Sequence, residues 1–180
     1  MIKQRPHIDS SSDPDSTGAA TQRVMQLLEG VPDPEVPVLN IIDLGIVREI
    51  ELIPPAGVIV VITPTYTGCP AMDVISMNIR MTLGSNGYAP VDIRTTLSPP
   101  WTTEWMSEAA KQKLEAFGIA PPNSAQSVCH LDLFQAEEAV RCPRCHSYHT
   151  GLISRFGSTA CKALYRCNDC KESFDYFKCH

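Results

Sequence analysis

Two pairs of cysteines near the C-terminus have the spacing of metal ligands. The pairs, Cys142-Pro-Arg-Cys145 and Cys167-Asn-Asp-Cys170, each enclose two residues and are separated by 21 residues. Four thiolates in this pattern suit a closed tetrahedral zinc site. Because residues 142–180 are too few to bury a self-sufficient core, we predict a zinc ribbon whose structural metal holds the fold.

The remaining cysteines and histidines of this region are candidates for additional ligands. Any of them could replace a paired cysteine, or hold a second metal or an iron-sulfur cluster. Cys161 has the strand parity of Cys167, so it could also pack beside the zinc. Four paired thiolates already complete a zinc shell, and we therefore favour structural zinc over an iron-sulfur cluster. The candidate additional ligands are Cys161, Cys179, His146, His149 and His180, and the role of Cys129 stays open.

Cys69 is the residue of the first half of the chain that stands out chemically. It lies in Thr67-Gly-Cys-Pro70, between an apolar run and a helical pattern. Because proline suits the first helical position, we place Cys69 at a helix N-terminus, where its thiol should be more acidic and more reactive than a free one. The alternative is a small core residue. With no histidine between His7 and His130, we expect no nucleophilic catalysis.

Three acids could lie near Cys69. Asp33, Glu35 and Asp43 belong to turns that could converge on its end of the sheet, where hydroxyls are supplied by Thr63, Thr65 and Thr67. Paired carboxylates can act as acid and base or bind a hard metal. Acids in such turns more often hydrogen-bond their own backbone, so we favour the turn role for each.

Hydrophobic periodicity predicts the elements that position these residues. The order is helix-strand-strand-helix-strand-helix, which is typical of an α+β domain with helices on one face of a small three-stranded sheet. The expected helices cover about 19–29, 72–83 (mostly buried) and 103–117, and the strands 46–52, 58–63 and 91–97.

The domain limits follow from these elements. We predict a disordered tail at 1–18, the α+β domain at 19–118, a linker at 119–141 with a short strand at about 128–134, and the zinc ribbon at 142–180, with strands at 150–156, 160–166 and 173–179. Trp101 and Trp105 are expected to be packing or interface anchors.

Charge is divided unevenly along the chain. Residues 1–141 carry nine basic and seventeen acidic side chains (−8), and residues 142–180 carry six and three (+3). The acidic part would repel phosphate, and the basic residues of the ribbon are scattered, so no nucleic acid is expected. The N-terminus lacks the apolar run of a secretory signal, and no stretch is apolar enough to span a membrane. We expect a soluble protein in the reducing cytoplasm.

Three motifs resemble those of a known family. Asp33-Pro-Glu35, Asp43-Leu-Gly45 and Thr67-Gly-Cys-Pro70 are similar to the hallmark motifs of the SufT-like iron-sulfur assembly factors, and the ribbon segments Phe156–Cys167 and Phe174–Cys179 are similar to those of the PaaD family, which is encoded with phenylacetyl-CoA epoxidase. The resemblance implies an accessory protein that helps mature this oxygenase by assisting assembly or delivery of iron or an iron-sulfur cluster. It makes Cys69 the reactive residue.

The resemblance also implies partners, namely the oxygenase or reductase subunits of phenylacetyl-CoA epoxidase and the iron-sulfur assembly machinery. Two other classes of function stay open. One is a structural or binding subunit of the oxygenase complex, in which Cys69 only packs. The other is a nucleic-acid-binding zinc ribbon. A homodimer is compatible with each of them.

Overall fold

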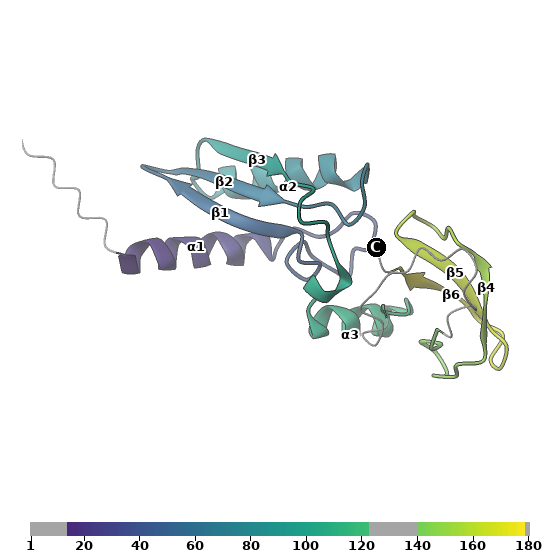
Figure 1. The fold of residues 1–180 in the computed structure, drawn as a ribbon. Helices are drawn as coiled ribbons and strands as arrows, with labels where there is room; N and C mark the ends of the chain where they lie inside the picture. Colours follow the sequence, from purple (N-terminus) through teal and green to yellow (C-terminus); the bar gives the residue numbers. More distant parts are fainter. Residues whose placement is uncertain (1–13, 123–139, 179–180) are drawn as a thin grey trace, which may run out of the picture.

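The computed structural model describes residues 14–122 and 140–178 and contains two small three-stranded sheets, with α-helices around the first (Figure 1). This is the α+β class with a C-terminal ribbon that the sequence predicts. The elements are α1 (Pro14–Leu28), β1 (Val47–Ile53), β2 (Gly57–Ile62), α2 (Ala71–Ser85), β3 (Val91–Thr95), a 3-10 turn (Thr103–Trp105), α3 (Glu108–Phe117), β4 (Thr150–Ser154), β5 (Lys162–Cys167) and β6 (Ser173–Phe177).

The first sheet has β2 in the middle. β1 and β2 form an antiparallel hairpin, whereas β2 and β3 are parallel and are joined through α2. Parallel neighbours require such a crossover. The segment 63–70, which leaves β2 and enters α2, therefore lies beyond the carboxyl end of a parallel pair. Ligands commonly bind at this position in α/β sheets.

The first and last predicted helices have different limits in the structure. α1 begins at Pro14 rather than at about residue 19, so the end of the predicted tail is helical, and residues 1–13 lie outside the described residues. The last helix is interrupted, because α3 starts only after Ser107, whose side-chain oxygen accepts a hydrogen bond from the Ala110 amide at 3.0 Å. Such an N-cap satisfies a free amide of the first turn.

The second helix is less buried than predicted. One stripe of α2 faces the core and consists of Ala71, Ile75, Ile79 and Leu83. The second apolar stripe is at the surface, with exposed fractions of 40% for Val74, 53% for Met77 and 62% for Met81. The prediction was wrong for this stripe because α2 packs on α1 and β3 along one side only.

A β-bulge explains an irregularity of the first strand. Arg48 interrupts the apolar alternation of β1, and the pairing register with β2 shifts between Val47 and Glu49. The extra residue of a bulge is released from the ladder, and here the Arg48 guanidinium lies 3.4 Å from the centroid of the Trp105 ring. Arg48 is therefore a surface residue held by a cation-π contact.

The ribbon is docked against the first domain. Ala120 pairs with β6, donating its amide to Asp175 O at 2.8 Å and accepting from the Phe177 amide at 2.9 Å. The Phe177 ring is 1% exposed and meets the Trp101 ring edge-on, with 6.2 Å between centroids. Trp101 is thus a packing anchor, as predicted, and the start of the predicted linker belongs to this contact. Residues 123–139, which include the predicted strand at 128–134, lie outside the described residues.

Candidate functional site

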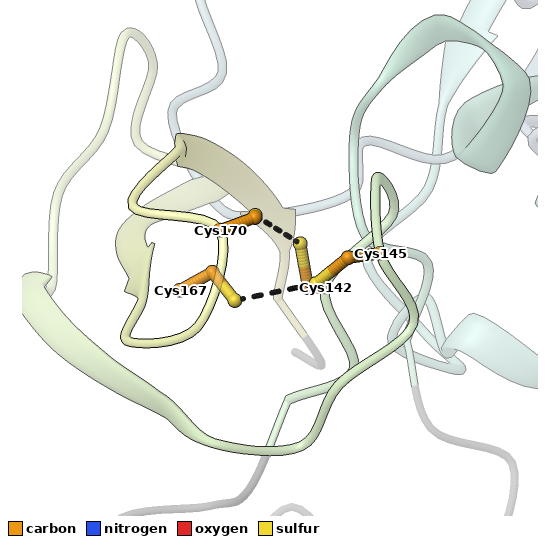
Figure 2. Close-up of side chains that lie close together, drawn as sticks. All are labelled: Cys142, Cys145, Cys167 and Cys170. Carbon is orange, nitrogen blue, oxygen red and sulfur yellow. Dashed lines mark hydrogen bonds between the residues drawn. The ribbon is translucent and has the colours of Figure 1, made fainter.

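The four paired cysteines of the ribbon form one compact cluster. Their sulfur atoms all lie within 4.8 Å of one another, with 3.7 Å between Cys142 and Cys170 and 3.5 Å between Cys145 and Cys167 (Figure 2). Tetrahedral zinc with Zn–S bonds of about 2.3 Å separates its sulfur ligands by about 3.8 Å. The cluster therefore fits a structural zinc ion with little adjustment.

Two similar turns build this cluster. The His146 amide donates to Cys142 O at 2.9 Å, and the Lys171 amide donates to Cys167 O at 3.0 Å. Both of these donors have a left-handed backbone, with φ of 62° and 69°. The backbone amide of Cys170 is the main cause that lowers the pKa of the Cys167 thiol to about 7, because a hydrogen bond to the charged form favours it. A local backbone amide thus favours the thiolate of Cys167. The pKa values of Cys145 and Cys170 are raised instead, because their backbone hydrogen bonds are outweighed by desolvation and by hydrogen bonds to the other cluster thiols.

The two histidine candidates within the described residues, His146 and His149, do not join the cysteine cluster. His146 Nδ1 lies 3.3 Å from Glu115 Oε1, and His149 Nδ1 lies 3.0 Å from Asp169 Oδ1. Each histidine therefore faces a carboxylate, and the cluster consists of the four paired cysteines that the sequence favoured as ligands. Two further candidates, Cys179 and His180, lie outside the described residues, as does Cys129, whose role stayed open.

Cys69 lies where the sequence places it, at the start of α2, with Pro70 as the N-cap. Its half-buried thiol is hydrogen-bonded by the Ala71 amide and the Tyr66 hydroxyl, both of which lower its pKa. Burial has the larger effect, and the carboxylates of Glu35 and Asp33 add to it, so the pKa is raised. The prediction of a more acidic thiol was wrong, because desolvation and nearby negative charge oppose the thiolate.

Two of the three acids shape turns. Asp33 Oδ1 accepts the amides of Glu35 at 2.8 Å and Val36 at 2.7 Å. Asp43 Oδ2 accepts the Asn40 amide at 3.2 Å and pairs with Lys113 Nζ at 2.6 Å. These contacts are the turn role that the sequence favours.

Glu35 behaves differently from the two turn-forming acids. Its Oε2 accepts a hydrogen bond from the thiol of Cys161 at 3.4 Å, across 126 residues of sequence. The carboxylate therefore faces a ribbon residue instead of its own turn.

One small pocket brings these groups together at the end of β2. Asp33, Glu35, Thr65 and Cys69 line it from the first domain, and Cys161 lines it from the ribbon. Apolar side chains complete the wall, among them Leu44, Ile46, Ile75 and Phe177. Asp43 is not part of this pocket, and Thr63 and Thr67 line a neighbouring one beside Trp101.

Cys161 is the site residue whose position the sequence did not predict. Its side chain is 3% exposed and packs in the core of the first domain rather than beside the zinc cluster. Burial is the main cause that raises the pKa of its thiol to about 11. No local spacing signals this placement, because it depends on how the ribbon docks.

Comparisons with known proteins agree with this architecture. The family described as "PaaD zinc beta ribbon domain" matches residues 126–178, and the family described as "Iron-sulfur cluster assembly protein" matches residues 21–88. A protein of Escherichia coli (strain K12), whose name describes it as a subunit of a "Putative 1,2-phenylacetyl-CoA epoxidase", is 51% identical over 87% of this chain and 91% of its own.

Other relatives match between half and three fifths of this chain. The "Fe-S protein maturation auxiliary factor" of Porphyromonas gingivalis is 37% identical over 51% of this chain and 87% of its own. Among solved structures, a domain of unknown function (DUF59) from Bacillus anthracis matches with a TM-score of 0.54 and 28% identity, over 57% of this chain and 97% of that one. None of the described helices has the length and apolar character needed to cross a membrane.

Proposed function

The chain belongs to the PaaD family, in which an iron-sulfur assembly domain is joined to a zinc ribbon, and on this premise we propose that it is an accessory factor that matures a phenylacetyl-CoA epoxidase. In this role Cys69 transiently holds iron or an iron-sulfur cluster as cargo for the oxygenase or reductase subunits. The ribbon zinc is structural. The process belongs in the cytoplasm, where thiols stay reduced.

The observation that carries the proposal is the position of Cys69. Its thiol lies beyond the carboxyl end of the parallel strands, between two hydrogen-bond donors and two carboxylates. A thiol with a raised pKa stays protonated until a metal displaces the proton, which suits transient binding better than nucleophilic attack. No histidine is among the described residues that line the pocket, and of its two carboxylates Asp33 is engaged with backbone amides of its own turn. We therefore propose a carrier and not a catalyst.

The ribbon supplies a surface for client recognition in this proposal. Three of its large apolar side chains are exposed, with exposed fractions of 61% for Tyr148, 53% for Ile153 and 68% for Phe156. Aromatic residues of this kind are enriched in protein interfaces. The oxygenase or reductase subunit would contact the ribbon while the cargo is held at Cys69.

Substitution of Cys69 tests the proposed function. The variant Cys69→Ser should keep its zinc and its fold, because the thiol is not a zinc ligand, whereas client subunits produced with it should lose most of their iron and acid-labile sulfide. The measurement is the iron, sulfide and visible absorbance of the purified client subunits. Asp73→Asn, an exposed change in the first turn of the same helix, is the matched control. Unchanged cluster content in the clients of Cys69→Ser would refute the carrier role.

The half-burial and raised pKa of Cys69 also favour a second candidate, a structural subunit of the oxygenase in which this thiol only packs. Such a subunit would remain with the active oxygenase in a fixed ratio, and Cys69→Ser would leave the activity unchanged. A maturation factor would instead be absent from the finished complex. The ratio of chains in the purified active enzyme separates these candidates.

A further inference from the structure

Cys161 takes no part in the zinc site, although it belongs to the ribbon. Its thiol lies 3.4 Å from Glu35 Oε2 and 3.0 Å from Thr159 Oγ1. The next residue, Lys162, is also buried and directs its ammonium group to Glu35 O at 3.3 Å. The ribbon therefore places a thiol beside the Glu35 carboxylate and a positive charge beside the Glu35 backbone carbonyl.

The pocket between the two domains contains two thiols. Cys69 and Cys161 line the same wall as Glu35, and the negative charge of Glu35 acts on both of them. The free volume of the pocket is about 10 Å³, which is room for about one water-sized body. A single ion fits this space, whereas a cluster of several iron and sulfur atoms would require the pocket to open.

Two thiolates and one carboxylate are a donor set for a divalent transition metal. Thiolate sulfur favours zinc and iron over magnesium or calcium. We propose that Cys69, Cys161 and Glu35 form a second metal site, shared between the two domains, that takes one divalent transition-metal ion. That this ion is ferrous iron, carried as cargo, rests on the proposed function.

Binding at this site exchanges protons for the metal and involves no redox step. Each cysteine loses its S–H proton to solvent, so one M²⁺ replaces two protons and bonds to two thiolates and the Glu35 carboxylate. Among the described residues, the four ribbon cysteines are the one group of three or more possible metal ligands whose atoms all lie within 4.8 Å of one another. The ligands of the second site thus share one pocket without forming a compact cluster, and binding closes the Cys69 and Cys161 side chains onto the ion.

This arrangement makes the affinity of the second site for a metal ion depend on pH. Both thiols are protonated at neutral pH because burial raises the pKa of each, so the apparent affinity should rise with pH by up to ~100-fold per unit for two displaced protons. The titratable and charged groups that act on the two thiols are Asp33, Glu35, Tyr66, Lys162 and Lys178.

Anaerobic titration of the full-length zinc-loaded protein with Co²⁺ tests the second site. Zinc binds such donor sets more tightly than cobalt, so the ribbon should keep its zinc. We expect one further equivalent of Co²⁺ with thiolate-to-metal charge-transfer absorption. Cys69→Ser and Cys161→Ser should each weaken binding at least tenfold and remove about half of this absorption, whereas Glu35→Gln should weaken binding with the absorption retained.

Controls separate a lost ligand from a lost fold. Glu49→Gln, an exposed change on β1, should bind Co²⁺ as the unaltered protein does. The zinc content and circular dichroism of each variant should match those of the parent, and Cys161→Ala provides a second, apolar replacement at the buried position. If neither Cys161 variant keeps its zinc and fold, the test rests on Glu35→Gln. An unchanged affinity of this variant for Co²⁺ then overturns the proposal.

The outcomes also separate this site from the proposed function. No extra equivalent of Co²⁺, or full binding by Cys161→Ser, would overturn the shared site, even if Cys69→Ser still prevented cluster loading in the client. Conversely, the expected cobalt spectra with unaltered client clusters would support the metal site and refute the maturation role.

Discussion

The two groups of cysteines in this protein are assembled in opposite ways. The ribbon cysteines come from two local turns and already lie within 4.8 Å of one another. Cys69 and Cys161 are brought to one pocket by the docking of two domains, and their thiols are held by a hydroxyl or a carboxylate instead of each other. A site made by local turns is compact before the metal arrives, whereas a site made by docking is adjustable. This difference suits the structural zinc predicted for the first and the transient cargo proposed for the second.

Among the changes that test this comparison, removal of zinc is expected to have the largest effect on the fold. Structural zinc contributes an apparent ~10–16 kcal/mol in small domains, so a chelator, or Cys145→Ser, should unfold the ribbon while the first domain keeps its sheet. Cys69→Ser should leave the fold unchanged. Far-UV circular dichroism and a colorimetric zinc assay measure both effects. A ribbon that stays folded without metal would show that docking, and not zinc, holds it.

The second largest effect is expected from loss of the Phe177 ring, which packs the ribbon against the first domain. Phe177→Ala removes a ring that is 1% exposed between the ribbon and Trp101, and truncation of a buried phenylalanine costs about 3–5 kcal/mol. The control Phe117→Ala, at a position that is 59% exposed, should change the free energy of unfolding by no more than about 0.5 kcal/mol. Urea unfolding provides both values, and equal losses in the two variants would contradict the observed interface.

The smallest expected effect concerns the reactivity of the pocket thiols. Because the pKa of Cys69 is raised, only a small fraction is thiolate at pH 7, and alkylation should be slower than for N-acetylcysteine and should increase about tenfold per pH unit up to pH 9. Cys161, with a pKa of about 11 and 3% exposure, should react more slowly still. Mass spectrometry of peptides from the zinc-loaded protein measures both rates. If the alkylation rate of Cys69 levels off below pH 8, the pKa of this thiol is lowered, as its helix position alone predicts, and not raised.

Sequence patterns predicted the parts of the fold that depend on neighbouring residues. The order of the elements and the four zinc ligands follow from periodicity and from the Cys-x-x-Cys spacing, because a turn or a strand is specified within a few residues. The exposed stripe of α2 and the bulge at Arg48 were not predicted. The first depends on which neighbours cover the helix, and the second on the pairing register of β1 with β2; periodicity within one segment contains neither.

The sequence by itself determined that four paired cysteines would gather in the C-terminal region and that Cys69 would start a helix after a buried strand. Only the tertiary structure decided the electrostatics of that thiol, because burial and the carboxylates of Asp33 and Glu35 oppose its ionisation more strongly than the helix amide favours it. It also decided the partner of Cys161, since a contact across 126 residues arises from the docking of the two domains.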